Sequence, residues 1–131
     1  MAWTPTDKEV AAVLQLDGTK RYSYLVKKIA DEQIVWGLWQ EGGWALASDD
    51  QGHELVPVWP HARFAALCTR DAWAGYVPKQ IELEIWLDRW LPGMERDGRN
   101  VAVFPTPDDH GVAVEPKRLG SDLRKESANY G

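Results

Sequence analysis

Tryptophan is the residue that most constrains how this chain can fold. Eight of its 131 residues are tryptophans, at positions 3, 36, 39, 44, 59, 73, 86 and 90. A buried indole removes roughly 150–250 Å² of surface from water, and its N–H group then needs a hydrogen-bond partner. So many large side chains require one sizeable core, which a chain of this length can enclose. We therefore expect residues 1–131 to form one globular domain with no internal linker.

Apolar spacing and turn residues predict the elements of the N-terminal half. One helix capped by Thr6 and a second capped by Thr19 should pack as an αα-hairpin, separated by Asp17 and Gly18. Three segments then follow that are rich in β-branched and aromatic residues, and tight turns separate them, which predicts an antiparallel meander. These segments cover residues 34–40, 44–48 and 54–59. Pro57 cannot donate to a ladder, so we expect the third strand to be an edge or to carry a bulge.

The C-terminal half predicts two more helices, a hairpin and a final helix. A helix should follow Pro60, then an irregular stretch over residues 71–80, then a longer helix that Pro92 kinks or splits near Leu91. Residues 100–105 and 111–115 predict a last hairpin, and Pro116 should open the terminal helix. Helices and strands that occur in runs favour the α+β class. We expect an antiparallel sheet of about five strands with helices packed mainly on one face.

Charge and cysteine content exclude several classes of protein. The net charge is −5 and the isoelectric point is about 5.1, which argues against binding to the phosphates of nucleic acids. The single cysteine, Cys68, cannot form an intrachain disulfide, so an oxidising compartment is not implied. The first residues lack the features of a signal peptide, and no apolar run approaches the roughly 20 residues that span a bilayer. We therefore expect a cytoplasmic protein with no membrane and no nucleic-acid partner.

Candidate metal ligands and nucleophiles are present, but their spacing matches no known motif. The acidic and histidine residues of two predicted turns are Asp49, Asp50, His53, Asp108, Asp109 and His110. They fit neither a calcium loop nor a zinc-binding helix, so we interpret them as two solvated turns. Cys68 could share a helix face with His61, but its apolar neighbours indicate a buried hydrophobic residue rather than a reactive thiol. Serine-nucleophile and phosphate-loop motifs are absent from the sequence. We expect no catalytic residue, no metal and no cofactor.

The tryptophans divide into core residues and candidates for a binding surface. Trp86 and Trp90 lie one helical turn apart on an apolar stripe, so we expect them in the core. Trp36 and Trp44 are also expected to point inward. The remaining candidates could plug the edge of a small core or form a binding surface, because tryptophan is enriched at interface hot spots. The candidates for such a surface are Trp39, Trp59 and Trp73.

Six segments in this order resemble a known family. They are Tyr22-x-Tyr24-x-x-x-Lys28-x-x-Asp31, Val35-Trp36-Gly37-Leu38, Gly43-Trp44-Ala45-Leu46, Pro57-Val58-Trp59-Pro60-His61, Trp90-Leu91-Pro92-Gly93-Met94 and Val101-Ala102-Val103-Phe104-Pro105-Thr106-Pro107. Together they are similar to the bacterial domain-of-unknown-function family 2750, over residues 6–123. The resemblance implies a small cytoplasmic bacterial protein and brings no catalytic residue with it. A more distant similarity to SseB-type accessory domains, which are binding modules, holds at the level of the fold.

Two functional hypotheses follow. The first is a non-catalytic protein-binding accessory module, whose edge strand near residues 54–58 pairs with a partner chain or with a second copy. The second is a small enzyme or ligand-binding protein, in which His61, with Asp49 or Asp109, lines a pocket that contains Trp59. The binding residues that we expect are therefore Trp39, Trp59, His61 and Trp73.

Overall fold

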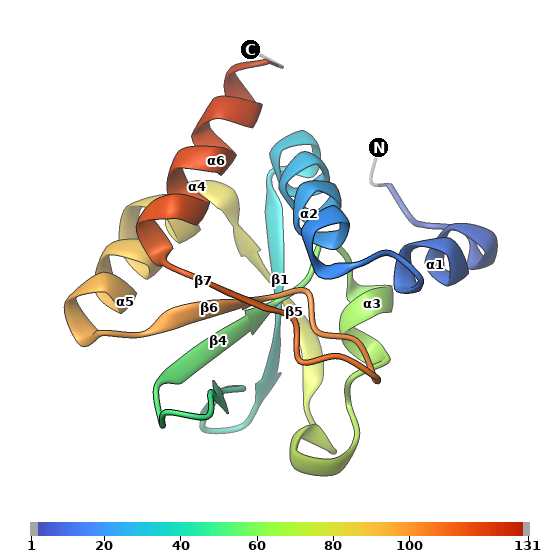
Figure 1. The fold of residues 1–131 in the computed structure, drawn as a ribbon, viewed down its shortest axis with the longest axis horizontal. Helices are drawn as coiled ribbons and strands as arrows, with labels where there is room; N and C mark the ends of the chain where they lie inside the picture. Colours follow the sequence, from blue (N-terminus) through green and yellow to red (C-terminus); the bar gives the residue numbers. More distant parts are fainter. Residues whose placement is uncertain (1–2, 130–131) are drawn as a thin grey trace.

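The computed structural model describes residues 3–129 and shows a mixed α+β fold (Figure 1). The helices are α1 (Asp7–Leu14), α2 (Gly18–Glu32), α3 (Ala62–Ala66), α4 (Leu83–Ile85), α5 (Leu91–Asp97) and α6 (Pro116–Ala128), with a 3-10 turn η1 (Asp71–Trp73) and a π-helical turn η2 (Trp86–Trp90). The strands are β1 (Ile34–Gln40), β2 (Gly43–Trp44), β3 (Ala47–Ser48), β4 (Glu54–Val58), β5 (Val77–Glu82), β6 (Asn100–Val103) and β7 (Val112–Val114). No described helix is long and apolar enough to cross a bilayer.

The strands form two sheets that are joined where β1 meets the end of β4. One sheet has the order β2-β1-β5 and the other has the order β3-β4-β6-β7. Only two residues separate β2 from β3, so this short segment passes from the first sheet to the second. Trp36 and Trp59 exchange backbone hydrogen bonds of 3.0 and 2.8 Å, which tie the sheets together. The antiparallel pairs β1–β2 and β3–β4 agree with the predicted meander, and β6–β7 agrees with the predicted hairpin.

The expectation of one antiparallel sheet of about five strands is wrong, because the structure has two sheets, of three and four strands, and one strand pair is parallel. β4 and β6 are parallel, in register from Leu55 opposite Asn100 to Val58 opposite Val103. The chain between them runs through α3, β5 and the α4–η2–α5 helix, which is a crossover long enough to return β6 in the same direction. β5 was also missed, because it lies across a stretch that we expected to be irregular. It pairs with β1 from Ile34 to Trp39.

β4 is not an edge strand, which corrects the expectation based on Pro57. It lies between β3 and β6. Backbone groups alternate along a strand, and those of Trp59 point toward β1. The nitrogen of Pro57 therefore points to the same side, between the Leu55–Ala47 pair of β3 and the Trp36–Trp59 bridge. The absent N–H falls where no ladder bond is required, so an interior strand can accept this proline.

The N-terminal αα-hairpin is not confirmed. Figure 1 shows α1 leaving the start of α2 and lying beside α3. Arg63 of α3 holds this end of the chain, because its guanidinium donates to the carbonyl oxygen of Pro5 at 2.8 Å and to Asp7 at 2.6 Å. α2 packs instead along α6, and α6 also packs against α5.

The predicted long helix is present and changes its winding at the expected place. α4, η2 and α5 follow one another without a break. Across the π turn, the N–H of Leu91 donates to the carbonyl oxygen of Trp86, five residues earlier. Pro92, which has no N–H to donate, lies in the first turn of α5. The π turn therefore ends where the proline begins, and it places Arg89 and Trp90 on the face that Met94 continues.

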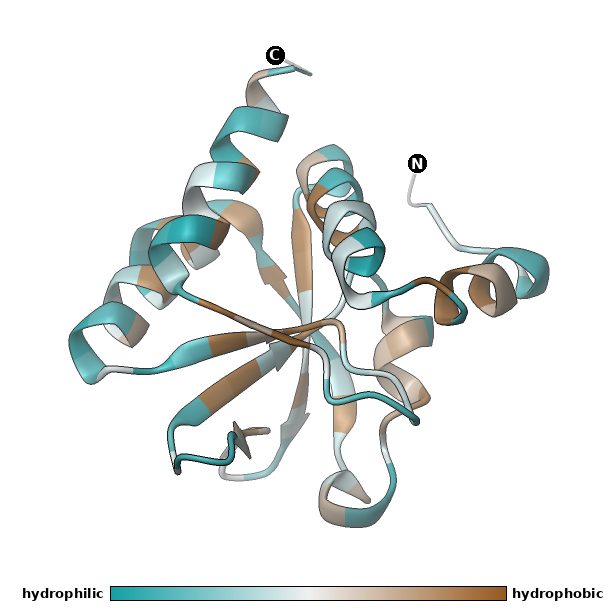
Figure 2. Ribbon diagram, viewed as in Figure 1, coloured by the Kyte–Doolittle hydropathy of each residue, from teal (hydrophilic) through white to brown (hydrophobic). Residues whose placement is uncertain are grey.

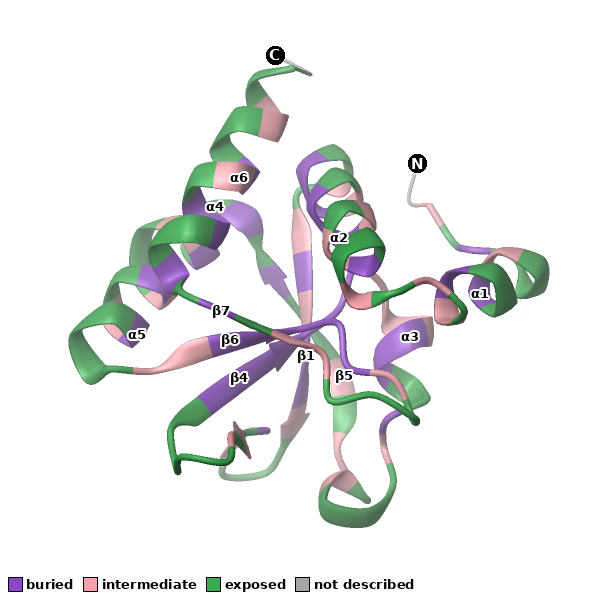
Figure 3. Ribbon diagram, viewed as in Figure 1, coloured by how far each residue is buried: buried purple, intermediate pink, exposed green. Residues whose placement is uncertain are grey.

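A single cluster of buried apolar side chains contacts both sheets. Its largest fully buried members are Trp59, Trp86, Phe64 and Phe104. Figure 2 shows that β4 and β6 are mostly hydrophobic, and Figure 3 shows that the same strands are buried while the outer faces of α5 and α6 are exposed. The helices therefore use amphipathic faces to cover apolar strands.

Candidate binding site

The tryptophans expected at the surface lie in three different environments. Trp59 is fully buried, so the expectation that it lies on a surface is wrong: its indole N–H donates to the carbonyl oxygen of Pro105 at 2.8 Å. Trp73 is half-buried and stands edge-on to Trp59, with ring centroids 5.9 Å apart. Its indole N–H donates to the carbonyl oxygen of Leu46 at 3.2 Å. Trp39 is also half-buried, and the Lys79 ammonium lies 4.3 Å from the centre of its ring.

His61 caps a helix and packs between aromatic rings. Its Nδ1 accepts the backbone N–H of Arg63 at 3.0 Å, at the start of α3. The rings of Trp3 and Trp36 lie 5.3 and 5.9 Å from the imidazole. Burial, with a smaller contribution from the Arg63 charge, lowers the pKa of His61. These contacts give His61 a structural role in holding α3 against the N-terminal segment.

The acids proposed beside His61 have partners elsewhere. Asp49 binds His53 at 3.0 Å within its own turn, and Asp109 binds the buried Arg21 at 2.6 Å. Neither Trp59 nor His61 lines the two cavities described below. Within residues 3–129, no three histidine, cysteine or acidic side chains are arranged to hold a metal ion. The structure does not bring these acids together with His61 and Trp59, as the alternative hypothesis of a ligand pocket required.

Cys68 is a buried hydrophobic residue, as the sequence predicted. Its side chain is packed in the core, and its thiol lies 3.4 Å from the carbonyl oxygen of Pro105. Burial raises the pKa of Cys68 to about 11. The thiol therefore stays protonated at neutral pH and is not a nucleophile.

Four tryptophans instead form a continuous row that joins the sheet to the helix. Trp39 and Trp44 are paired across β1 and β2, with ring centroids 5.1 Å apart. Trp44 then meets Trp90 of η2 edge-on at 4.9 Å, and Trp90 lies 5.5 Å from the buried Trp86. Edge-to-face aromatic pairs at such distances stabilise a protein beyond the area that they bury. The row fixes β2 against the helix and leaves Trp44 and Trp90 half-exposed.

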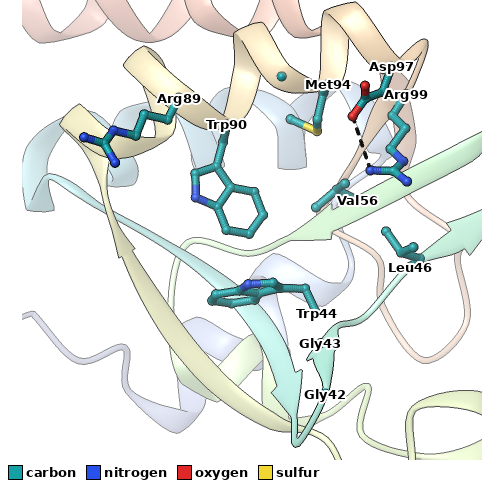
Figure 4. Close-up of a pocket in the computed structure, with 11 residues that line it drawn as sticks. Gly42, Gly43, Trp44, Leu46, Val56, Arg89, Trp90, Met94, Asp97 and Arg99 are labelled. Carbon is teal, nitrogen blue, oxygen red and sulfur yellow. Dashed lines mark ion pairs between the residues drawn. The ribbon is translucent and has the colours of Figure 1, made fainter.

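These two half-exposed rings form the walls of an open cleft of about 570 Å³, which we call the tryptophan cleft. One side of the cleft is the β2–β3 segment, the other is the η2–α5 helix, and Val56 of β4 lies between them. Figure 4 shows Trp44, Trp90 and Met94 lying around the same space, with Leu46 and Val56 near one end. The lining residues are Gly42, Gly43, Trp44, Leu46, Val56, Arg89, Trp90, Gly93, Met94, Asp97 and Arg99.

Charged groups lie only at the ends of the tryptophan cleft. In Figure 4, Arg89 lies at one end of the helical wall and Asp97 and Arg99 lie at the other. Asp97 and Arg99 form a loose ion pair of 3.6 Å, whereas Arg99 binds Glu54 more closely, at 2.8 Å. The hydrogen bond from Arg99 to Glu54 raises the pKa of Arg99. Among the described residues that line the cleft, those at its centre are apolar, and none of them places a polar side chain there to orient a reacting group.

Gly93 is the least expected residue of this wall. A glycine inside a helix costs up to about 1 kcal/mol relative to alanine. A Cβ atom added at Gly93 would meet only the end of the Arg96 side chain, at 3.6 Å. Gly120 of α6 is different, since its Cβ would lie 3.2 Å from Leu91 Cδ1. The packing of the chain itself therefore explains Gly120 and does not explain Gly93.

A second, smaller cavity of about 270 Å³ lies beside Trp73. It is bordered by β3, the η1 turn and the loop that follows β6, and its lining includes Ser48, Thr106 and His110. The left-handed backbone angles of Asp71 and Phe104, with φ of 53° and 55°, are found next to it. This cavity brings Trp73 together with one of the two acidic turns.

Sequence reasoning missed most of the tryptophan cleft. Trp44 and Trp90 were expected in the core, Met94 was placed on the same apolar helix stripe as Trp90, and neither Leu46 nor the end charges were assigned to a site. One signal was available: Arg89, Trp90, Gly93, Met94 and Asp97 follow one another at intervals of one, three, one and three residues. A helix face that mixes apolar side chains, a glycine and charges of opposite sign is typical of an interface rather than a core.

Comparison with known proteins gives one match. Residues 22–123 match the family described as Protein of unknown function (DUF2750). The match begins in α2, ends in α6 and includes both walls of the tryptophan cleft. No curated protein and no solved structure matches the chain. The distant similarity to SseB-type accessory domains is not shown by these comparisons.

Proposed function

The chain belongs to the DUF2750 family of proteins of unknown function, and we propose that it is a non-catalytic module that binds protein segments in its tryptophan cleft. The observation that carries this proposal is the composition of the cleft. Trp44, Trp90 and Met94 surround an apolar centre, and arginines lie at its ends. Tryptophan, methionine and arginine are the residues that protein interfaces enrich.

The shape of the tryptophan cleft favours a protein ligand over a small substrate. A small-molecule site places a few polar groups inside an apolar cavity to orient its ligand. Here the polar groups lie at the ends, and the walls are a helix and a strand segment with three glycines, Gly42, Gly43 and Gly93. Glycines let another backbone approach closely. The alternative of a ligand pocket near His61 and Trp59 has less support, because Trp59 is buried and His61 caps α3.

Selection of peptides from a random library displayed on phage tests the proposal. Wild-type protein is the bait, and the Leu46→Asp variant is used for counter-selection. Leu46 is 41% exposed at the rim of the cleft, so a charge there should change the cleft without unfolding the chain. Leu67→Asp is the matched control, because Leu67 is 38% exposed at the C-terminal end of α3 and does not line the cleft. Circular dichroism confirms that both variants are folded.

The expected result is a set of apolar peptides that bind wild type and Leu67→Asp equally. Their affinity for Leu46→Asp should fall by roughly tenfold or more, since truncating or charging a hot spot costs more than about 1 kcal/mol. Equal binding to all three proteins, or failure to select any peptide that depends on Leu46, would show that the cleft is not a binding site.

A further inference from the structure

We propose that the tryptophan cleft binds the same surface of a second copy of this chain. The two copies form a two-fold symmetric dimer whose α5 helices cross antiparallel at Gly93. The proposal rests on the proposed function, because it names the partner of the same cleft. In a two-fold interface each patch meets itself, so every residue near the axis meets its own copy. The face must therefore be self-complementary.

The charges of the helical wall have this self-complementary arrangement. Arg89 and Asp97 each lie four residues from Gly93, on opposite sides of it. All three line the tryptophan cleft, so they share one face of the helix. At about 1.5 Å per residue, the two charges are about 12 Å apart along the helix axis. An antiparallel copy centred on Gly93 places Arg89 of each chain opposite Asp97 of the other, which makes two ion pairs.

Both charges are available for such pairs. Arg89 is exposed, and none of the salt bridges within residues 3–129 involves it. Within the described part of the chain, the one ion pair of Asp97 is its 3.6 Å contact with Arg99, and Arg99 already binds Glu54 at 2.8 Å. Charge complementarity of this kind fixes the register of two docked surfaces.

Gly93 explains why the two helices would cross at this position. Packed helices are normally separated by about 8–10 Å, a distance that the side chains at the contact determine. A glycine at the centre of the contact lets the two backbones approach more closely. The isolated chain has no packing reason for a glycine at this position, since an added Cβ would meet only the end of Arg96 at 3.6 Å. A second helix at Gly93 supplies that reason.

The apolar part of the face is placed to fill the centre of the dimer. Trp90 and Met94 flank Gly93 on the helix, and Leu46 stands 41% exposed on the opposite wall. In the dimer, Leu46 of one chain packs against the exposed parts of Trp44 and Trp90 of the other, whose ring centroids are 4.9 Å apart. This arrangement gives an apolar centre with charges at the periphery, which is the usual anatomy of a specific interface. The β4 strand, in contrast, has neighbours on both sides and offers no edge for pairing.

Sedimentation equilibrium of charge-swapped variants tests the dimer. Wild-type protein should dimerise between micromolar and millimolar concentrations. Arg89→Asp and Asp97→Arg should each raise the dimer dissociation constant by roughly tenfold or more, because each creates two like-charge contacts in a symmetric interface. The double variant restores the pairs with reversed sign and should return the dissociation constant to within about threefold of wild type.

Arg124→Asp is the matched control for Arg89→Asp, because it makes the same change in net charge on the exposed face of α6 and should leave dimerisation unchanged. A monomeric wild type at all these concentrations overturns the proposal, and so does a dimer that the two single swaps do not weaken or the double swap does not restore. The proposed function is separable from this result. If the selection yields Leu46-dependent peptides but the protein is monomeric, the cleft is a site for another protein. If no such peptides are found and the protein is also monomeric, the cleft is not a binding site.

Discussion

His61 combines three roles that make its protonation state matter for stability. It caps α3 through Nδ1, packs against two tryptophan rings and lies near the Arg63 charge. Each of these favours the neutral imidazole: a protonated Nδ1 cannot accept the Arg63 N–H, and burial disfavours the charge. The carboxylates of Glu32 and Glu9 act in the opposite direction, but the pKa of His61 is lowered on balance.

The lowered pKa of His61 predicts a loss of stability in acid. A histidine in the unfolded chain has its ordinary pKa of 6.5, so as the pH falls through this value the unfolded chain takes up the proton more readily than the folded chain. The contribution of neutral His61 to the free energy of unfolding is complete above this pH. It decreases as the pH falls further, and the decrease ends when the folded His61 is itself protonated. His61→Asn keeps a capping acceptor and removes the titration. Urea unfolding from about pH 7.5 to about pH 5 should show a weaker pH dependence for this variant.

The control for this prediction is His110→Asn, in an exposed turn, which leaves the contribution of His61 in place. If His61→Asn and wild type lose the same free energy of unfolding over this pH interval, then the neutral form of His61 is not what the fold requires.

Trp59 is a single residue whose polar and apolar parts both stabilise the fold. Its ring is fully buried, and its N–H holds the carbonyl oxygen of Pro105 at 2.8 Å. Trp59→Phe removes the hydrogen bond and leaves a cavity, so the free energy of unfolding should fall by about 2–3 kcal/mol. Trp73→Phe loses a longer bond at a half-exposed site and should cost less than about 1 kcal/mol. Urea unfolding followed by far-UV circular dichroism measures the free energy of unfolding of both variants. Equal decreases for Trp59→Phe and Trp73→Phe would contradict the larger stabilising role given to Trp59.

At the scale of the element, Gly93 should lower the stability of its helix and strengthen dimerisation. Gly93→Ala should raise the free energy of unfolding by up to about 1 kcal/mol, because alanine favours the helix and its Cβ meets only the end of Arg96. The same methyl group lies at the helix crossing and should raise the dimer dissociation constant. Gly120→Ala is the control, since its Cβ would crowd Leu91 at 3.2 Å and should give no gain. Unfolding is measured at concentrations where the chain is monomeric.

The same elements show how far local sequence patterns reach. Most helices and β-hairpins could be predicted because they have a local signal, such as the cap at Thr6 or the apolar spacing from Leu83 to Met94. The cap expected at Thr19 is wrong, because Asp17 caps α2 and accepts the backbone N–H of Lys20. β5 has no such signal: Pro78, Lys79 and Gln80 make it look like a loop. It is a strand because β1 supplies the partner, and Pro78 is tolerated since its nitrogen points away from β1 at the outer side of the pair.

Parallel pairing and the tryptophan cleft depend on contacts between distant segments. Nothing local to β4 or β6 shows that they lie side by side, because this pairing is set by the crossover between them. The spacing of Trp86 and Trp90 correctly placed both on one helix face, yet it could not show how completely that face is covered. Trp86 is fully buried, whereas Trp90 borders the cleft. The site was missed because the segments that cover this helix face come from distant parts of the chain.

At the scale of the whole molecule, the contacts at the junction of the two sheets indicate that the sheets unfold together. The Trp36–Trp59 bridge joins them through the backbone. Val35 of β1 and Val58 of β4 are both fully buried in the same apolar cluster. Neither sheet has a separate core, so partial unfolding of one would expose the apolar face of the other. This arrangement predicts cooperative unfolding of the chain as one domain.

Calorimetry and hydrogen exchange test that cooperativity together. The calorimetric and van't Hoff enthalpies of the monomer should agree, and fluorescence and circular dichroism should give the same midpoint. The amides of Trp36 and Trp59, which bond across the junction, should exchange only by global unfolding, so their exchange free energies should equal the global value. Amides of α1, a short helix at the periphery, should exchange faster through local opening. Two separate transitions, or fast exchange at Trp36 and Trp59, would mean that the sheets are independent units and that the wall of the tryptophan cleft formed by β2 can move without the helix.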